Sequence, residues 1–419
     1  MSETFKKLQK YNYWDGKNLN VGFKRSNYLE KITQYVGNSL VKVFVGQRRS
    51  GKSYLLRQII SQLATQGINP KNIFYLNKEM VDFDEIKDYK QFYSLLKLYK
   101  KTLNIKGKVY LLVDEIQEVE GWEKIVNSLS QNYKEQYEIF ITGSNSRMLS
   151  SELATYLSGR YVTFEIYPFS FLEYISYKKM PKNKESFIEY LKSGGLPELF
   201  HLPEEEIKAH YVSSLKDTVM LKDIVQRYNI KDSQLLEDVF KFISGNIGNL
   251  FSINSLVNYL KSNGVKTNHE TISNYIIYLT QSFLIHCAER YDIKGKEIFS
   301  GSKKYYLNDL SFKNYLSSGF NFGIGKHLEN IIYLHYRSLG YIVYVGSIQG
   351  EEVDFVIEKG DEKKYVQVTY SLSDRKVANR EFRALEKIND SFEKIVISLD
   401  EISLGNKNGI RHFCAWDLK

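Results

Sequence analysis

The sequence predicts an α/β protein whose first part is a parallel sheet and whose second part adds helical and further α/β structure. Between residues 39 and 170, apolar runs of strand length alternate with helical stretches, a pattern typical of parallel sheets with crossover helices. A glycine-rich loop joins the first run to a helix, and a later run ends in two adjacent acids. The length of 419 residues also exceeds what one hydrophobic core usually encloses. We therefore expect several domains, the first of them built around a phosphate-binding loop.

Composition limits the class of protein. The chain is 43% hydrophobic and 26% charged, which is ordinary for a globular protein and excludes a largely disordered one. Its two cysteines, Cys287 and Cys414, lack metal-ligand spacing and suit a reducing compartment. Neither a signal peptide nor an apolar run of about eighteen residues is present. We expect a cytoplasmic protein without a membrane partner, and the net charge of +9 is compatible with a polyanion.

The apolar run at 40–45 leads into Gly-Gln-Arg-Arg-Ser-Gly-Lys-Ser at 46–53 and then into a helix. Glycines at 46 and 51 allow backbone N–H groups to converge on phosphate oxygens at a helix N-terminus. Lys52 is expected to reach the β- and γ-phosphates, and Ser53 to ligate Mg²⁺. A chance glycine-rich turn is the alternative, which the strand–loop–helix context disfavours. The predicted nucleotide contacts are Gly46, Arg48, Arg49, Ser50, Gly51, Lys52, Ser53 and Tyr54.

A second element of the predicted site is the pair of acids after the apolar run at 109–113. Asp114 and Glu115 would lie at the carboxyl edge of the sheet, where ligands of open parallel sheets bind. Asp114 is the predicted second magnesium ligand, and Glu115 is predicted to polarise the water that attacks the γ-phosphate. A solvated strand end is the alternative for this pair.

Two further candidates follow the next strands. Asn145 or Ser144, after the predicted strand at 138–142, could orient the attacking water, although both residues also suit a tight turn. Arg160, before the predicted strand at 161–166, could offset charge on the γ-phosphate or pair with a surface carboxylate. We count Asn145 and Arg160 with Asp114 and Glu115 as candidate catalytic residues.

The chain resembles the AAA-type ATP-binding proteins of bacteria and archaea, which join an archaeal-ATPase-like core to a C-terminal domain of unknown function. The resemblance rests on residues 46–53, 114–117 (Asp-Glu-Ile-Gln), 121–122 (Gly-Trp), 142–144 (Thr-Gly-Ser), 157–160 (Leu-Ser-Gly-Arg), 168–173, 194–198 (Gly-Gly-Leu-Pro-Glu) and 222–225 (Lys-Asp-Ile-Val). It implies that Asp114 and Glu115 are the metal-associated and catalytic acids and that Ser144 or Asn145 is a sensor. It also implies that Asn77 restrains Glu115, and that Arg160 acts either in trans or on the γ-phosphate in cis.

Apolar residues at helical spacing predict a helical lid over residues 171–230, after the core at 39–170 and an N-terminal segment at 1–38. Residues 231–320 then predict a winged-helix-like domain, with a helix at 252–260, a second helix at 268–279 and two strands after it. Such a fold can read DNA through its second helix or can bind protein. The residues leave both alternatives open.

The segment 321–419 resembles the restriction-endonuclease-like core in its order of helix glutamate, strand aspartate and Gln-x-x motif. Glu329, Asp354 and Gln367 are candidate metal ligands by this resemblance. The position of the water-activating lysine holds Thr369, so we expect a degenerate nuclease-like domain that does not cleave.

The sequence thus predicts an ATPase that hydrolyses ATP with Mg²⁺ to drive conformational change, on nucleic acid or together with a protein or a second copy of itself. An ATP-gated binding module for DNA or protein, with little turnover, is the alternative.

Overall fold

The structure, a computed structural model, describes residues 3–16, 19–145, 157, 159–316 and 323–418. The chain divides into two compact units, Met1–Ile166 and Tyr167–Lys419, each with its own sheet. Ser158 of the predicted Leu-Ser-Gly-Arg segment lies outside the described residues. None of the helices in the described part of the chain is both long and apolar enough to span a membrane.

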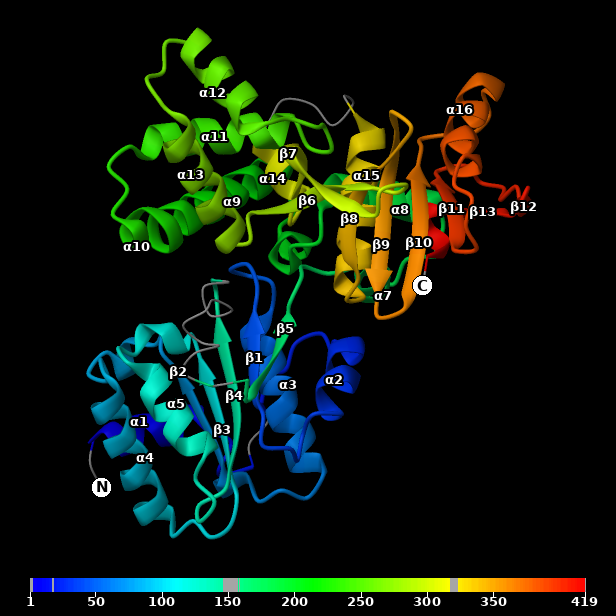
Figure 1. Cartoon of the computed structure of the whole chain (residues 1–419). Helices are drawn as coiled ribbons and strands as arrows, with labels where there is room; N and C mark the ends of the chain where they lie inside the picture. The colour runs from blue at the N-terminus through cyan, green and yellow to red at the C-terminus, as the bar shows by residue number, and fades with distance from the viewer. Residues whose placement is uncertain (1–2, 17–18, 146–156, 158, 317–322, 419) are drawn as a thin grey trace. The chain divides into compact units, whose positions relative to one another are not determined.

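The first unit is a five-stranded sheet with helices on both faces (Figure 1). Its strands are β1 (Val41–Val45), β2 (Ile73–Asn77), β3 (Val109–Asp114), β4 (Tyr137–Gly143) and β5 (Tyr161–Glu165). Its helices are α1 (Glu3–Tyr11), α2 (Ser26–Thr33), α3 (Lys52–Thr65), α4 (Tyr89–Leu103) and α5 (Trp122–Ser130). The strand order is β2-β3-β4-β1-β5, and every pairing is parallel. The predicted parallel α/β sheet is confirmed.

The central strands are apolar along their length because the sheet is covered on both faces. All five residues of β1 are buried. On one face, α2 and α3 contribute Leu29, Leu55 and Ile59 to a core that also contains Phe44 and Leu112 of the strands. This arrangement places the carboxyl ends of β1, β3 and β4 next to one another, and the residues that follow these strands share one edge of the sheet.

The second unit begins with helices where the sequence predicts a lid. Its helices up to the second sheet are α7 (Phe171–Lys178), α8 (Lys184–Ser193), α9 (Glu205–Thr218), the π-helix η6 (Val219–Val225), α10 (Gln226–Tyr228), α11 (Ser233–Gly245), α12 (Ile253–Ser262) and α13 (His269–Gln281). Within the predicted lid, α9, η6 and α10 follow one another without a break, and the π-helical stretch contains the Lys-Asp-Ile-Val motif. A π-helix is rare and is frequently found at functional sites.

One mixed sheet of eight strands extends through the rest of the second unit, in the order β12-β13-β11-β10-β9-β8-β6-β7. Its strands are β6 (Ile285–Asp292), β7 (Glu297–Leu307), β8 (Ile342–Ile348), β9 (Glu351–Lys359), β10 (Glu362–Val368), β11 (Glu393–Ser398), β12 (Asn406–Lys407) and β13 (Ile410–Cys414), and its helices are α14 (Ser311–Leu316), α15 (Ile324–Ser338) and α16 (Arg375–Glu386). The hairpin β6–β7 follows α13, and β6 pairs in parallel with β8. The hairpin predicted as a wing and the predicted nuclease-like segment therefore share one sheet.

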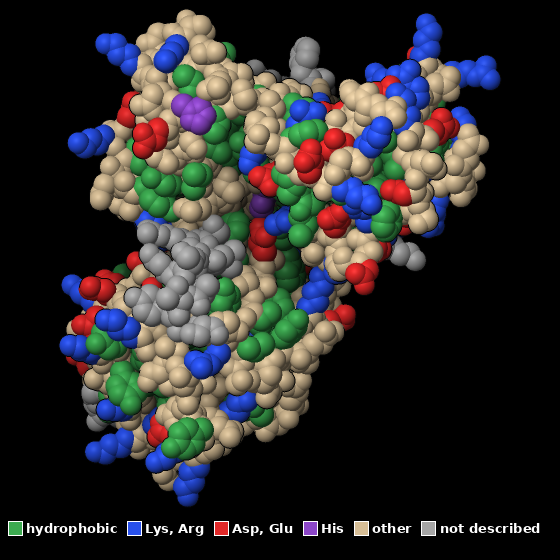
Figure 2. All heavy atoms as spheres, in the orientation of Figure 1, with side chains coloured by type: hydrophobic (Ala, Val, Ile, Leu, Met, Phe, Trp, Pro, Cys, Tyr) green, Lys and Arg blue, Asp and Glu red, His purple; other side chains and the backbone are tan. Residues whose placement is uncertain are grey.

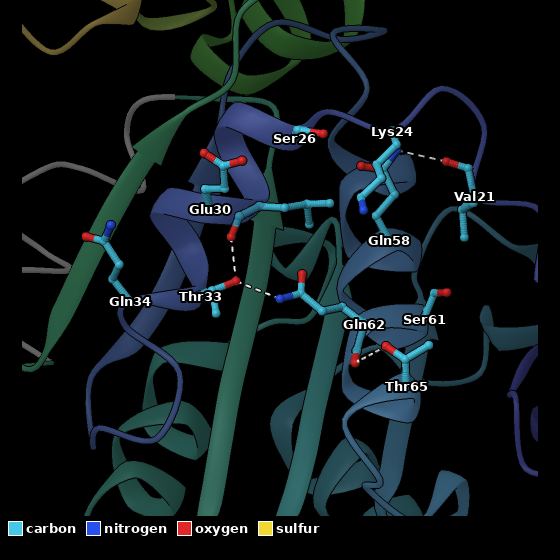
Figure 3. A pocket seen from close by; sticks show the side chains of 11 residues that line it. Val21, Lys24, Ser26, Glu30, Thr33, Gln34, Gln58, Ser61, Gln62 and Thr65 are labelled. Carbon is cyan, nitrogen blue, oxygen red and sulfur yellow. Dashed lines mark hydrogen bonds between the residues drawn. The ribbon is translucent and has the colours of Figure 1, made fainter.

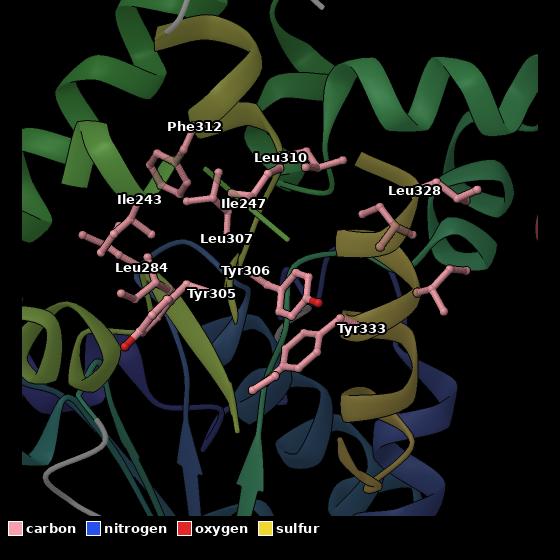
Figure 4. Packing of buried hydrophobic residues seen from close by; sticks show 14 of the residues in the cluster. Ile243, Ile247, Leu284, Tyr305, Tyr306, Leu307, Leu310, Phe312, Leu328 and Tyr333 are labelled. Atoms are coloured by element: carbon pink, nitrogen blue, oxygen red, sulfur yellow. The ribbon is translucent and has the colours of Figure 1, made fainter. Parts of the chain in front are cut away.

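Two apolar cores lie on the two faces of this sheet. Leu328 of α15 packs with Phe355 and Val366 in the larger core, parts of which Figure 4 shows. Phe382 of α16 packs with Val356 in the smaller core. Successive side chains of a strand point to opposite faces, and neighbouring Phe355 and Val356 accordingly belong to different cores.

Candidate nucleotide-binding site

The glycines of the phosphate loop occupy positions that other residues would strain. Gly46 has a φ of 149°, and a Cβ there would lie 2.3 Å from the carbonyl oxygen of Ile166. Gly51 has a φ of 98° and directly precedes α3. Between them the chain turns from β1 into the helix, so that the first N–H groups of α3 face the carboxyl edge of the sheet. The loop has the backbone required to hold a phosphate.

Lys52 is buried inside this loop. Its Nζ donates hydrogen bonds to the carbonyl oxygens of Gly46 at 2.9 Å and of Gln47 at 3.0 Å, and lies 3.8 Å from Glu115 Oε1. Only 4% of the residue is exposed. A buried ammonium that contacts two neutral carbonyls and one carboxylate is well placed to transfer its hydrogen bonds to an anionic oxygen.

The other predicted loop contacts occupy different environments. Arg48 forms an ion pair with Glu79 at 2.5 Å, and Arg49 is exposed with a left-handed φ of 68°. Ser50 is fully buried, whereas Tyr54 is 42% exposed with the Arg57 guanidinium 4.0 Å from its ring centroid. The two arginines add positive charge at the rim of the loop.

Asp114 lies at the centre of a hydrogen-bond network on the neighbouring strand. Thr142 Oγ1 donates to Asp114 Oδ1 at 2.5 Å, Tyr75 Oη donates to Oδ2 at 3.2 Å, and the Ser53 hydroxyl also hydrogen-bonds this carboxylate. Burial, and then the adjacent Glu115 carboxylate, raise the pKa of Asp114 above its ordinary value. The structure therefore brings the two predicted magnesium ligands, Ser53 and Asp114, into direct contact.

These oxygen donors fit Mg²⁺. Magnesium prefers hard oxygen ligands and commonly takes one or two from the protein and the rest from phosphate and water. A bound cation would also favour the ionised form of Asp114, which burial disfavours. Ser53 and Asp114 are the residues that would hold it.

Glu115 is buried, with 6% of its surface exposed, and has a left-handed φ of 53°. Its backbone N–H donates to Thr142 Oγ1 at 2.9 Å, which fixes the turn after β3. Gln117 Nε2 donates a hydrogen bond to Glu115 Oε2. Asn77, predicted to restrain this glutamate, instead accepts a hydrogen bond from Glu79 N at 2.9 Å. In this structure the side-chain amide that contacts Glu115 belongs to Gln117.

Ser144 and Asn145 directly follow β4 and are buried, with 0% and 1% of their surfaces exposed. Arg160 lies elsewhere. Its carbonyl accepts a hydrogen bond from Val41 N at the start of β1. The phosphate loop follows the other end of that strand. At 3.3 Å per residue, the two ends of β1 are about 13 Å apart. The structure therefore does not bring Arg160 next to the phosphate loop, and its predicted contact with the γ-phosphate in cis stays a prediction. Arg160 is exposed, and its predicted role in trans stays a prediction.

Sequence reasoning missed Arg25, which supports the loop from the N-terminal segment. Its guanidinium donates to the Ser50 carbonyl at 3.1 Å, and its own backbone N–H donates to Gln58 Oε1 at 3.1 Å. Gln58 also donates to the carbonyls of Val21 and Phe23, at 2.8 and 2.7 Å. Only 2% of Arg25 is exposed. Nothing in the local sequence pattern identifies this arginine, because its partners are distant in the chain.

A pocket of about 820 Å³ lies between α2 and α3 (Figure 3). Gln58 lines it, as do Thr33 and Gln62, which are joined by a hydrogen bond of 2.7 Å. No residue of the phosphate loop is among its lining residues in the described part of the chain. The pocket therefore adjoins the helix that supports the loop without being the phosphate site.

The second unit also gathers predicted site residues. Glu329 of α15, Asp354 of β9 and Gln367 of β10 line an open pocket of about 860 Å³ together with Thr369. Asp354 Oδ2 accepts from Val368 N at 2.8 Å, and Gln367 Oε1 accepts from Asp354 N at 3.2 Å. Burial, then the nearby Glu329 carboxylate, raise the pKa of Asp354 to about 7. These acids lie beside Lys304 of β7, a lysine that no sequence motif identifies.

Comparisons with known proteins agree with the site in the first unit. Residues 38–175 match a family model described as an AAA domain, and residues 184–322 match one described as a domain of unknown function (DUF8612). An uncharacterized protein of Haemophilus influenzae is 38% identical over 378 residues, which make up 89% of this chain and 92% of that protein. The chain belongs to the same family. The uncharacterized protein MJ1544 of Methanocaldococcus jannaschii is 32% identical over 367 residues, 83% of this chain and 78% of that protein.

Solved structures show more distant likenesses to this AAA-domain protein. Aeropyrum pernix ORC1 in complex with DNA has a TM-score of 0.34 and 12% identity, and covers 73% of this chain and 96% of its own. AMPPCP-bound DnaA from Aquifex aeolicus has a TM-score of 0.31 and 14% identity, and covers 65% of this chain and 91% of its own. Likenesses at these scores do not bear on function. The AAA domain spans the phosphate loop, Asp114, Glu115 and Asn145.

Proposed function

We propose that this AAA-domain protein binds ATP with Mg²⁺ and hydrolyses it to drive conformational change. The observation that supports the proposal most directly is the convergence of Lys52, Ser53, Asp114 and Glu115 at one edge of the sheet. Lys52 Nζ lies 3.8 Å from Glu115 Oε1, and the Ser53 hydroxyl hydrogen-bonds Asp114. Phosphoryl transfer depends mainly on positioning and on charge stabilisation, and these side chains can provide both.

Each residue has a distinct part in the proposed reaction. The N–H groups of the loop and the Lys52 ammonium bind and orient the triphosphate. Glu115 accepts a hydrogen bond from the attacking water and aligns it with the γ-phosphate. Thr142 fixes both acids, because its hydroxyl donates to Asp114 and accepts from Glu115 N. Mg²⁺ held at Ser53 and Asp114 would neutralise charge on the phosphate oxygens.

Replacement of Lys52 tests nucleotide binding itself. Lys52→Ala should abolish ATP binding in a calorimetric titration, because it removes the only side-chain ammonium within the loop, residues 46–53. Lys71→Ala is the matched control, since Lys71 is exposed and lies before β2, at the opposite edge of the same sheet. Micromolar affinity retained by Lys52→Ala would contradict the proposal.

An ATP-gated binding module with little turnover is the second candidate, and the second unit supplies the observation that favours it. The order α11, α12, α13, β6, β7, with an additional bridge between Phe251 and Lys303, is compatible with the predicted winged-helix-like domain and supports this candidate. Figure 2 shows Lys and Arg side chains gathered over α16, whose exposed residues include Arg375, Lys376, Arg380 and Arg383. Basic faces of this kind bind phosphate backbones.

Phosphate release and DNA binding distinguish the two candidates. A working ATPase should release phosphate at steady state, and DNA should change the rate. A gated module should bind duplex DNA in an ATP-dependent manner with little release. DNA binding that weakens steeply with salt would indicate contacts with the phosphate backbone. Charge reversal at Arg375 and Lys376 should weaken DNA binding if α16 makes these contacts. Charge reversal at Lys294 and Lys296, in the β6–β7 turn, is the comparison. An exposed Arg160 that acts in trans would further require that the protein assembles with itself.

A further inference from the structure

The two carboxylates predicted as metal ligands in the second unit, Glu329 and Asp354, enclose the ammonium of a lysine together with Glu352. Lys304 Nζ lies 2.8 Å from Glu329 Oε1, 2.6 Å from Glu352 Oε1 and 3.6 Å from Asp354 Oδ1. The Lys304 side chain is 1% exposed. We propose that this ammonium is a resident cation that takes the place of a divalent metal, and that it joins the β6–β7 hairpin to the nuclease-like fold.

The donor set does not fit Mg²⁺ while Lys304 is present, because both oxygens of Glu329 are already used by protein donors. Glu329 Oε1 accepts from Lys304 and from the Tyr306 hydroxyl, both at 2.8 Å, and Glu329 Oε2 accepts from Lys326 at 2.9 Å. Magnesium requires about six oxygens at roughly 2.1 Å in octahedral geometry. Within the described ranges, no group of three or more His, Cys, Asp or Glu side chains is arranged to hold a metal ion.

The position of Gln367 supports the same conclusion. Its Oε1 accepts from Asp354 N at 3.2 Å, and its Nε2 donates to Glu381 Oε2 at 2.7 Å. The side chain that would complete a metal site is therefore engaged with the backbone and with another carboxylate. A metal ion would therefore have to displace the Lys304 ammonium and bind to the carboxylates without Gln367.

Lys304 cannot easily leave the acids, because its backbone and its neighbours are fixed. It pairs with Ala288 across the hairpin, and Tyr306, two residues further along β7, is fully buried. The Tyr306 ring stacks on Tyr333 of α15 (Figure 4), and the two ring centroids are 4.3 Å apart. Removing one partner from such a buried ionic cluster destabilises the folded state, because the remaining charges stay buried without an opposite charge.

The cluster connects elements that are distant in sequence. Lys304 belongs to β7, Glu329 to α15, and Glu352 and Asp354 to β9. Lys326 of α15 also donates to the Gly248 carbonyl at 2.8 Å, in the loop between α11 and α12. The Lys304 ammonium thus links the predicted winged helix to the predicted nuclease-like fold. We infer that this pocket stabilises the second unit and does not support metal-dependent hydrolysis.

Manganese binding to the full-length protein tests the inference in the absence of nucleotide, by electron paramagnetic resonance. Lys304→Met should create a Mn²⁺ site at least tenfold tighter than any in the wild type, because it leaves three carboxylates without their central cation. Adding Glu329→Gln to this variant should remove the new site. Lys303→Met is the matched control: Lys303 is the preceding residue, and its side chain pairs with Glu289 at 2.7 Å outside the cluster.

A second measurement does not depend on the folding of Lys304→Met. Asp114→Asn removes the predicted magnesium ligand of the first unit, so Mn²⁺ bound by that variant reports on the second unit. The inference expects no binding there at millimolar Mn²⁺. It would be overturned if Asp114→Asn bound Mn²⁺ at a site that Glu329→Gln abolishes, or if a folded Lys304→Met gained no site.

Discussion

Lys52 in the first unit and Lys304 in the second are both buried lysines next to carboxylates, and their contacts differ. Lys52 donates to two loop carbonyls, and its nearest acid oxygen is 3.8 Å away. Lys304 lies within 2.8 Å of two carboxylates and 3.6 Å from a third. An ammonium held by neutral carbonyls can exchange them for phosphate, whereas an ammonium enclosed by acids is already neutralised. In the proposals made above, the number of adjacent carboxylates separates the lysine that binds nucleotide from the lysine that stabilises the fold.

The largest effect expected from this comparison concerns the acid next to each lysine. Glu115→Gln should lower ATP turnover by about 10²–10⁴-fold, because the amide cannot act as the general base. ATP binding, measured by calorimetry, should persist. Glu352→Gln, next to Lys304, should leave turnover unchanged. Equal losses of turnover in the two variants would show that the two lysine sites do not differ in the way proposed.

A third buried lysine cluster lies within the AAA domain and extends the comparison. Glu138 of β4 is 1% exposed and pairs with both Lys42 and Lys108. Glu138→Gln should destabilise the protein by about 3 kcal/mol in denaturant unfolding, since Lys42 loses its buried partner. Glu135→Gln should cost less than about 1 kcal/mol, because its pair with Lys100 is half exposed. Similar values for the two variants would argue against a structural role for the cluster.

The smallest expected effect concerns Gln117. Gln117→Ala should reduce kcat about tenfold with little change in KM, because it removes one hydrogen bond of roughly 1.4 kcal/mol to the Glu115 carboxylate and none to nucleotide. Single-turnover hydrolysis would measure the change, and Gln131→Ala, at the exposed residue that directly follows α5, provides the control. A rise in KM with kcat unchanged would instead place Gln117 in nucleotide binding.

Sequence patterns predicted the first unit well because its signals are local. The phosphate loop is eight consecutive residues, and Asp114 and Glu115 directly end an apolar strand, so parallel topology alone brings them together. Arg160 shows the limit of this reasoning: it too adjoins a strand, but it precedes β5 instead of following it, which places it at the opposite edge.

Residues that act across long sequence separations could not be predicted in this way. Lys304 precedes Glu329 by 25 residues and Asp354 by 50, and it belongs to a strand that the pattern assigned to the winged helix. The sequence shows that Thr369 occupies the position expected for a lysine. It does not show that Lys304, from another strand, places its ammonium next to the same acids. Arg25 and Gln117 similarly acquire their roles through hydrogen bonds that have no periodic signature.

The shared sheet has a practical consequence for dissecting the protein. Because β6 pairs with β8, a fragment that ended before α15 would expose the backbone of β6 as a free edge, and such edges promote aggregation. The same cut would leave Lys304 without Glu329, Glu352 and Asp354. Truncations intended to isolate the AAA domain should therefore divide the chain near residue 166, between the two compact units, and should keep everything after that point in one piece.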